Sequence, residues 1–198
     1  MSTKSVIGSY QDIYHEINVE RLGLFRLVGE MYSCKEVLYP GCSIHVTPSF
    51  VFPHVVYVDK SADAKAFFED QAELMNFVMR KREYKRKPFI QFLHRDYSEV
   101  LPLQPESFDL LLSFFAGRIA PACKKYLRKG GLLLTNQRGE ADSGFRLVAA
   151  IRFEGGKYKF VDEVVVPARE PSKKYLRQSA RGFEYVENET YFVFEKRA

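Results

Sequence analysis

Apolar positions in the first part of the chain follow a helical spacing and then a short continuous run. From residue 15 to residue 31 they recur at the spacing of an amphipathic helix that lies on a core. The apolar members of this helix are Ile17, Leu24, Phe25, Val28 and Met31. Residues 36–39 form a largely apolar run that stops at Pro40 and Gly41. This pair ends a strand because proline lacks an N–H and glycine permits a sharp turn. The pattern predicts a helix, a buried strand and a tight loop.

The middle of the chain alternates apolar runs with helical patterns. Strands are predicted over residues 55–58, 89–93, 108–113 and 132–135. The prolines at 48 and 53 leave room only for a short helix between the strand at 36–39 and the strand at 55–58. Ser61 and Asp70 are N-cap residues of two further helices, and another helix over residues 120–127 ends at Gly130 and Gly131. Strands that alternate with helices at this spacing imply βαβ units and a parallel sheet.

The last third follows a different pattern. Phe145, Leu147, Val148 and Ile151 have a spacing that fits a helix. Residues 158–166 and 189–196 are strand-like, and the stretch between them has too little helix for a parallel crossover. We expect these two runs to pair antiparallel at one end of the sheet. The sequence thus predicts an α/β fold, mostly parallel, with an antiparallel C-terminal strand pair.

Composition adds a domain count and a compartment. The chain has 198 residues, 46% hydrophobic and 28% charged, which suits one domain over residues 1–198 with the helical segment 10–33 packed on it. The N-terminus lacks the apolar core of a secretory signal, and no apolar run approaches the roughly 20 residues of a membrane span. Cys34, Cys42 and Cys123 have neither CxxC spacing nor a nearby histidine pair, which argues against a disulfide framework or a structural zinc site. We expect a cytoplasmic protein with no membrane segment and no metal.

The order of elements resembles that of class I S-adenosylmethionine-dependent methyltransferases over nearly the whole chain. That family has a Rossmann-like three-layer fold, whose seven-stranded sheet ends in an antiparallel strand. Its cofactor lies at the loop after the first strand and at acidic residues after the second and third, and its fourth strand ends beside the transferred methyl group. The resemblance implies S-adenosylmethionine as the cofactor, bound by the residues that occupy these places in this chain. They are Tyr39, Gly41, Cys42, Asp59, Lys60, Asp96, Tyr97 and Ser113.

The separation of Gly41 and Asp59 supports this assignment. Asp59 follows Gly41 by 18 residues, as expected if two adjacent parallel strands present their carboxyl ends to one ligand crevice. A carboxylate there can accept hydrogen bonds from both hydroxyls of a ribose. As ordinary structure, Asp59 would cap the next helix, Gly41 would make a plain turn, and Asp96 and Tyr97 would belong to a polar loop. The loop departs from the family pattern, because it has a single glycine and Tyr39 stands where an acidic residue is usual.

Catalytic residues are not assigned, because methyl transfer needs an in-line approach and only sometimes a base. His45, His54 and His94 are candidate bases near the crevice, although a lone loop histidine is more often hydrogen-bonded filler. Residues 113–118 lack the Asn/Asp-Pro-Pro-aromatic signature, which disfavours methylation of adenine N6 or of glutamine. The chain lacks the GxGxxG motif of nicotinamide-dependent dehydrogenases, so we rank a dehydrogenase third among the candidate functions. We expect a methyltransferase of unknown substrate; the alternative is a catalytically inactive methyltransferase-like fold that serves as a binding or partner protein.

Basic residues form two clusters in a chain of formal net charge +5. Residues 80–87 hold six cations and are either a phosphate-binding patch or localisation signal, or a solvated helix end. We predict that charge reversal of Arg80, Arg82 and Arg86 leaves cofactor binding unchanged. A second cluster lies between the last two predicted strands and suits a small-molecule substrate of anionic character or a nucleic acid. Its members are Arg169, Lys173, Lys174, Arg177 and Arg181.

Overall fold

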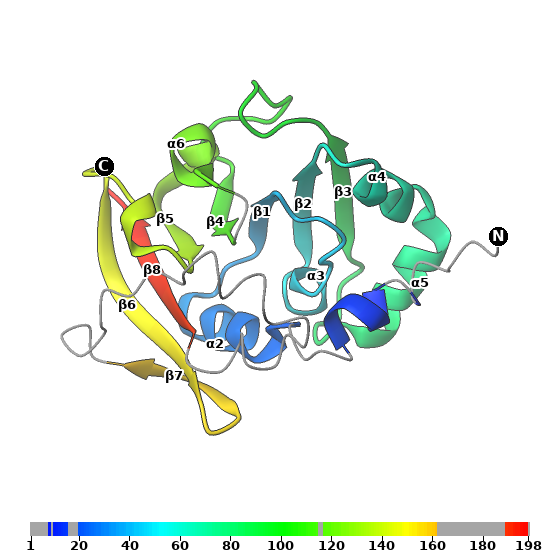
Figure 1. The fold of residues 1–198 in the computed structure, drawn as a ribbon, viewed down its shortest axis with the longest axis horizontal. Helices are drawn as coiled ribbons and strands as arrows, with labels where there is room; N and C mark the ends of the chain where they lie inside the picture. Colours follow the sequence, from blue (N-terminus) through cyan, green and yellow to red (C-terminus); the bar gives the residue numbers. More distant parts are fainter. Residues whose placement is uncertain (1–7, 9, 16–19, 115–116, 162–188, 198) are drawn as a thin grey trace.

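The computed structural model of the chain describes residues 8, 10–15, 20–114, 117–161 and 189–197, and these contain one eight-stranded sheet (Figure 1). The strand order is β3-β2-β1-β4-β5-β8-β6-β7. The first five strands in this order are parallel to one another. The strands are β1 (Glu36–Pro40), β2 (His54–Asp59), β3 (Phe89–His94), β4 (Phe108–Ser113), β5 (Leu127–Thr135), β6 (Phe145–Glu154), β7 (Lys157–Val161) and β8 (Thr190–Lys196).

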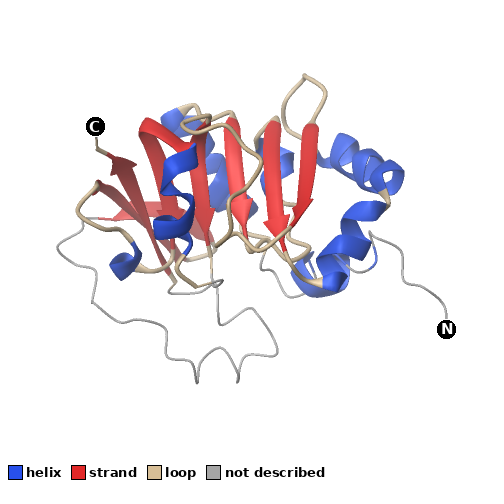
Figure 2. Ribbon diagram, turned by 90° about the horizontal axis from the view of Figure 1, so that it is seen from above, coloured by secondary structure: helices blue, strands red, loops and turns tan. Residues whose placement is uncertain are grey.

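Helices cover both faces of this sheet (Figure 2). The helices are η1 (Gln11–His15), α2 (Leu22–Tyr32), α3 (Pro48–Val51), α4 (Ala62–Glu69), α5 (Gln71–Lys81), α6 (Ile119–Cys123), η2 (Lys124–Tyr126) and η3 (Arg138–Glu140). Side chains of α2, α3, α4 and α5 share one apolar core with Val37, Tyr57 and Leu112 of the strands. Side chains of α6 share a second core with Leu38 and Leu111. Successive strand residues point to opposite faces, so strands covered on both sides are apolar throughout. The predicted three-layer, mostly parallel α/β fold is confirmed.

The N-terminal helix is shorter than its sequence pattern predicts. It begins at Leu22 rather than at residue 15, because Arg21 before it has a left-handed backbone with φ 55°. Of the predicted apolar face, Phe25 and Val28 are buried and Met31 is exposed. Residues 16–19 lie outside the described part of the chain. No helix within the described residues has the length and apolar character needed to cross a membrane.

The prediction of a helix over residues 145–151 is wrong, since this stretch belongs to β6. The pairing of β6 with β8 shifts register between Leu147 and Ala149, which leaves Val148 as an extra residue in the strand. Phe145 and Leu147 face one core, and Ala149 and Ile151 pack on the other, while Val148 remains exposed. β6 is the strand that raises the expected number from seven to eight.

The C-terminal strands pair differently from the arrangement expected. Both predicted runs contain strands at the antiparallel end of the sheet, but β6 lies between β7 and β8. β8 is inserted between β5 and β6 and is antiparallel to both, and β7 pairs with β6 as a hairpin. These three strands form the end of the sheet opposite α4 and α5 (Figure 1).

Gly130 and Gly131 lie inside β5 rather than before it. Gly130 has φ 70°, and the pairing of β4 with β5 shifts register between Phe108 and Leu110. The glycines therefore form an irregularity within a strand that begins at Leu127. The predicted helix over residues 120–127 is correspondingly reduced to α6 and the short η2.

Candidate functional site

The carboxyl ends of β1 and β2 bring Gly41 and Asp59 together. Pro40 of β1 pairs with Val58 of β2, and the Gly41 N–H donates to the Val58 carbonyl oxygen at 2.7 Å. Gly41 has φ 65°, a conformation that favours glycine. The Asp59 carboxylate accepts from the backbone N–H of Ser43 in the same loop, at 2.8 Å. The juxtaposition expected from the spacing of these two residues is therefore present.

Asp59 also ties the loop to the next helix. Its second oxygen accepts from the Ser61 N–H at 2.8 Å, and Ser61 caps α4 by accepting from the Ala64 N–H. The carboxylate thus already carries out the structural role that the sequence left open as an alternative. Each of its oxygens has further lone pairs, so these two bonds leave acceptor capacity on Asp59.

The end of β3 adds a second carboxylate beside the first. Lys60 Nζ lies 2.8 Å from Asp96 Oδ2, and Ser98 donates to Asp96 through both its N–H and its hydroxyl. The hydrogen bond from Lys60 holds the pKa of the Asp96 carboxyl well below its usual value. His94 Nε2 contacts the Lys60 carbonyl oxygen at 3.1 Å. The Tyr97 side chain packs against the α6-side core.

Tyr39 and Cys42 face the core. The Tyr39 hydroxyl lies 3.0 Å from His45 Nδ1, and His45 Nε2 lies 3.0 Å from the Glu20 carbonyl oxygen. Because a carbonyl only accepts, Nε2 carries the proton and Nδ1 accepts from Tyr39. Burial lowers the pKa of His45 to about 3, so the ring is neutral. Burial also raises the pKa of the Cys42 thiol well above its usual value, which makes it a packed residue and no nucleophile.

Tyr14 of the N-terminal segment covers the loop after β1. Its ring stacks on His45 with centroids 4.6 Å apart. Burial raises the pKa of Tyr14 to about 12, and Cys42 and Asp59 lie close enough to contribute to that rise. The η1 segment therefore closes over the crevice that the resemblance assigns to the cofactor.

Ser113, at the carboxyl end of β4, faces a buried carboxylate that sequence reasoning missed. The Ser113 hydroxyl and the Thr135 hydroxyl donate to one oxygen of Glu140, and the Ala120 N–H donates to the other at 2.8 Å. Glu140 thus joins the ends of β4 and β5 to the start of α6. No local pattern marks this residue, because its partners lie on three separate elements.

A second buried polar group lies at the ends of β4, β5 and β8 and was also missed. The Arg21 guanidinium donates to the Tyr191 hydroxyl at 2.6 Å, lies 3.4 Å from a Glu189 oxygen and sits over the Phe114 ring. Burial raises the pKa of Glu189. Asn136, next to this group, is buried, and its Oδ1 has no hydrogen-bond partner among the described residues. A buried amide oxygen without a partner is costly, which makes this place a candidate for a polar ligand.

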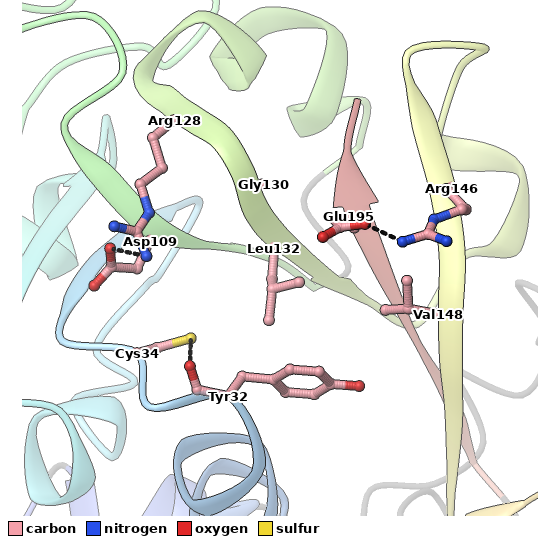
Figure 3. Close-up of a pocket in the computed structure, with 9 residues that line it drawn as sticks. All are labelled: Tyr32, Cys34, Asp109, Arg128, Gly130, Leu132, Arg146, Val148 and Glu195. Atoms are coloured by element: carbon pink, nitrogen blue, oxygen red, sulfur yellow. Dashed lines mark hydrogen bonds and ion pairs between the residues drawn. The ribbon is translucent and has the colours of Figure 1, made fainter. Parts of the chain in front are cut away.

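Two further features lie at the amino ends of the parallel strands, away from the proposed cofactor site. His54 begins β2 and pairs with Glu36, so its prediction as a base near the crevice is wrong. A pocket of about 310 Å³ opens at this amino edge between α2 and the strands β5, β6 and β8 (Figure 3). Leu132 and Val148 contribute apolar walls, and two ion pairs, one of which joins Arg128 to Asp109, border it. Ligands of open α/β sheets bind at the carboxyl ends of strands, so we assign the candidate site to the other edge.

Comparisons with known proteins identify the fold. No protein-family model matches the chain, and no curated protein matches its sequence. Among solved structures, the N-methyltransferase NodS from Bradyrhizobium japonicum matches with a TM-score of 0.52 and 14% identity, over 92% of this chain and 97% of that one. A methyltransferase from Geobacter sulfurreducens matches with a TM-score of 0.50 and 14% identity, over 99% of this chain and 92% of that one.

A third solved structure shows that this fold supports more than one reaction. The [4+2]-cyclase SpnF matches with a TM-score of 0.52 and 12% identity, over 91% of this chain and 81% of that one. At these identities the similarity establishes architecture, and function must be argued from the site. The chain has the Rossmann-like fold of class I S-adenosylmethionine-dependent methyltransferases.

Proposed function

We propose that this protein is an S-adenosylmethionine-dependent methyltransferase that acts on a small-molecule acceptor. The observation that carries the proposal is the register of β1 and β2, in which the Gly41 turn and the Asp59 carboxylate share the carboxyl edge of the sheet. In open α/β sheets this edge is where nucleotide-like ligands bind. The fold shared with NodS supports the same reading.

The chemistry of the residues present fits the cofactor. Asp59 keeps acceptor capacity for ribose hydroxyls after its two backbone hydrogen bonds, and Gly41 presents backbone without a side chain. Lys60 and Asp96 add a charged pair at the neighbouring strand end. S-adenosylmethionine supplies a methyl group on a positively charged sulfur. We keep as proposed cofactor residues Tyr39, Gly41, Cys42, Asp59, Lys60, Asp96, Tyr97 and Ser113, of which Tyr39, Cys42 and Ser113 have buried side chains and would contribute backbone groups.

The acceptor would bind at the ends of β4, β5 and β8, beside the proposed cofactor. Asn136 Oδ1, which has no partner among the described residues, can accept from an N–H or O–H of the acceptor. Glu189 is the carboxylate there whose pKa burial raises, so it is suited to take a proton, and Arg21 holds it in position. We propose a small-molecule acceptor with a polar nucleophile. The second basic cluster, which suggested an anionic acceptor, lies outside the described residues.

A catalytically inactive fold that serves as a binding or partner protein is the second candidate. It is favoured by the coverage of the loop after β1, since the Tyr14 ring stacks on His45. It is also favoured by the two backbone N–H groups that already occupy Asp59. Under this reading the loop after β1 is structural, and the cofactor does not bind.

Titration calorimetry with S-adenosylmethionine and with S-adenosylhomocysteine separates the two candidates. We expect micromolar binding by the wild type and a loss of at least about tenfold in Asp59→Asn, equivalent to about 1.4 kcal/mol. The amide oxygen can accept from only one of the two backbone N–H groups, so thermal unfolding is measured alongside to show that the variant is folded. Asp63→Asn, at an exposed acid in the first turn of α4, is the matched control and should bind like wild type. Absence of binding by folded wild-type protein would establish the inactive candidate.

We further propose that the protein works in the cytoplasm. Cys34, Cys42 and Cys123 are all free and buried, and Cys34 and Cys123 have their pKa raised to about 12 by burial. Unpaired thiols are usual where the compartment is reducing. Fractionation of cells with an antibody against the chain tests this proposal, and enrichment in a secreted or membrane fraction would contradict it.

A further inference from the structure

The basic segment of residues 80–87 lies at the amino edge of the sheet, far along the strands from the proposed cofactor site. It leads into β3, whose first residue, Phe89, pairs with His54 at the start of β2. The cations in this segment are Arg80, Lys81, Arg82, Lys85, Arg86 and Lys87. All of them are exposed except Arg82, which is half-buried. The segment is therefore a surface feature separate from the carboxyl-end crevice.

The cations of this segment carry charge that the described part of the chain does not neutralise. None of them has a carboxylate within salt-bridge distance among the described residues. The acidic residue within the segment, Glu83, is bound by Arg26 of α2. Cations elsewhere on the described surface are more often matched, as in the pairs Lys124–Asp142 and Lys196–Glu106. The segment is thus a concentrated positive patch.

A helix C-terminus does not account for this patch. Only Arg80 and Lys81 lie in the last turn of α5, where cations offset the helix dipole. The other four follow the helix in an irregular stretch, beyond the range of that effect. The apolar face of α5 is buried in the core through Phe77 and Val78, so it is not available to insert into a lipid surface.

An aromatic ring borders the cations. Phe89 is 48% exposed, and its ring centroid lies 4.1 Å from that of His54. An exposed ring beside lysines and arginines is the combination that binds single-stranded nucleic acid, because bases stack on the ring while cations contact phosphates. A lipid surface would use the charges but has no base to stack.

We propose that the surface formed by residues 80–87 and Phe89 binds single-stranded nucleic acid through its phosphates and one stacked base. This goes beyond the proposed methyltransferase function and does not depend on it. The affinity comes from phosphate contacts, so it carries little sequence preference and falls steeply with salt.

Fluorescence anisotropy with labelled single-stranded RNA and DNA of about 12 nucleotides tests the proposal. The patch variant Arg80→Glu, Lys85→Glu, Arg86→Glu should bind at least about tenfold more weakly than wild type, with a shallower dependence of log affinity on log salt. The control variant Lys129→Glu, Lys157→Glu, Lys159→Glu makes the same change of net charge at exposed positions on β5 and β7 and should bind within about twofold of wild type. Phe89→Ala should lose about tenfold, since a stacked base contributes roughly 1.4 kcal/mol in such sites.

The outcomes that would overturn the proposal are distinct. An equal loss in the control variant would mean that only overall charge matters, and binding to anionic vesicles without binding to oligonucleotides would assign the patch to a lipid surface. Tighter binding of duplex than of single strands would remove the stacking role of Phe89. S-adenosylhomocysteine binding, measured by calorimetry on the same variants, should be unchanged in the patch variant, and a thermal unfolding curve like that of wild type shows independently that the variant is folded. Failure of oligonucleotide binding with cofactor binding intact would refute this proposal alone.

Discussion

At the scale of single residues, His45 is a group whose charge the fold determines. Its folded pKa of about 3 lies below the ordinary value of 6.5, so the unfolded chain binds a proton at higher pH than the folded chain does. The contribution of neutral His45 to the free energy of unfolding is therefore fully present above about pH 6.5, and it is lost as the pH falls toward 3. Between pH 7 and pH 5 we expect a loss of about 2 kcal/mol from this residue, at 1.36 kcal/mol per unit.

Urea unfolding at the two pH values, compared between wild type and His45→Gln, measures this loss. The variant cannot take up the proton, so its stability should change less between pH 7 and pH 5, although it is less stable at both because the bonds to Tyr39 and Glu20 are altered. An unchanged pH dependence in His45→Gln would contradict the buried neutral state.

The site residues that could be predicted from the sequence are those that directly follow predicted strands. Gly41 and Asp59 follow successive strands, and parallel strands bring such residues to one edge. Arg21 and Glu189 are 168 positions apart in the chain, and their ion pair depends on β8 lying beside β5. The sequence does not predict such an ion pair, because an arginine or a glutamate taken alone is expected on the surface.

At the scale of elements, Asp70 both ends α4 and begins α5. Its side chain accepts from the Glu73 N–H at 3.0 Å, as its sequence pattern predicts. We expect Asp70→Ala to lower the free energy of unfolding by about 1 kcal/mol, and Asp70→Ser to restore most of it. Glu69→Ala, which removes only an exposed pair with Lys65, should cost less than about 0.5 kcal/mol. Urea midpoints give both values, and equal losses would mean that the cap contributes nothing.

The wrong helix prediction at β6 has a physical cause in its bulge. A regular strand places every second residue on one face, but the extra residue at Val148 reverses this parity. Phe145, Leu147 and Ile151 keep the even spacing of a strand, but the bulge residue Val148 adds an apolar position out of phase with them, three residues before Ile151. Their spacing imitates a helical turn, and only pairing with β8 distinguishes the two structures.

At the scale of the whole molecule, the N-terminal segment couples to the proposed cofactor site through Tyr14. If the cofactor binds where Tyr14 now lies, the bound state requires the ring to move away from Ser43 and His45. We expect Tyr14→Ala to bind S-adenosylhomocysteine more tightly, by about tenfold if the covered state holds about 90% of the molecules. Stopped-flow binding and calorimetry measure this gain.

Tyr14→Phe is the matched control, since it keeps the ring that stacks on His45 and removes only the hydroxyl. Its affinity should stay close to that of wild type. Weaker binding by Tyr14→Ala, with the fold intact by thermal unfolding, would instead make Tyr14 a wall of the cofactor site.

The position of β8 also bears on how the protein is made. β5 and β6 are synthesised before residues 190–196. The side of each strand that pairs with β8 therefore stays open until β8 has been made. Until then, a nascent chain carries two open strand edges on the ribosome, with a hairpin of β6 and β7 that has no sheet to join. We therefore expect the insertion of β8 between β5 and β6 to be a late step of folding, because it closes contacts between segments far apart in the sequence.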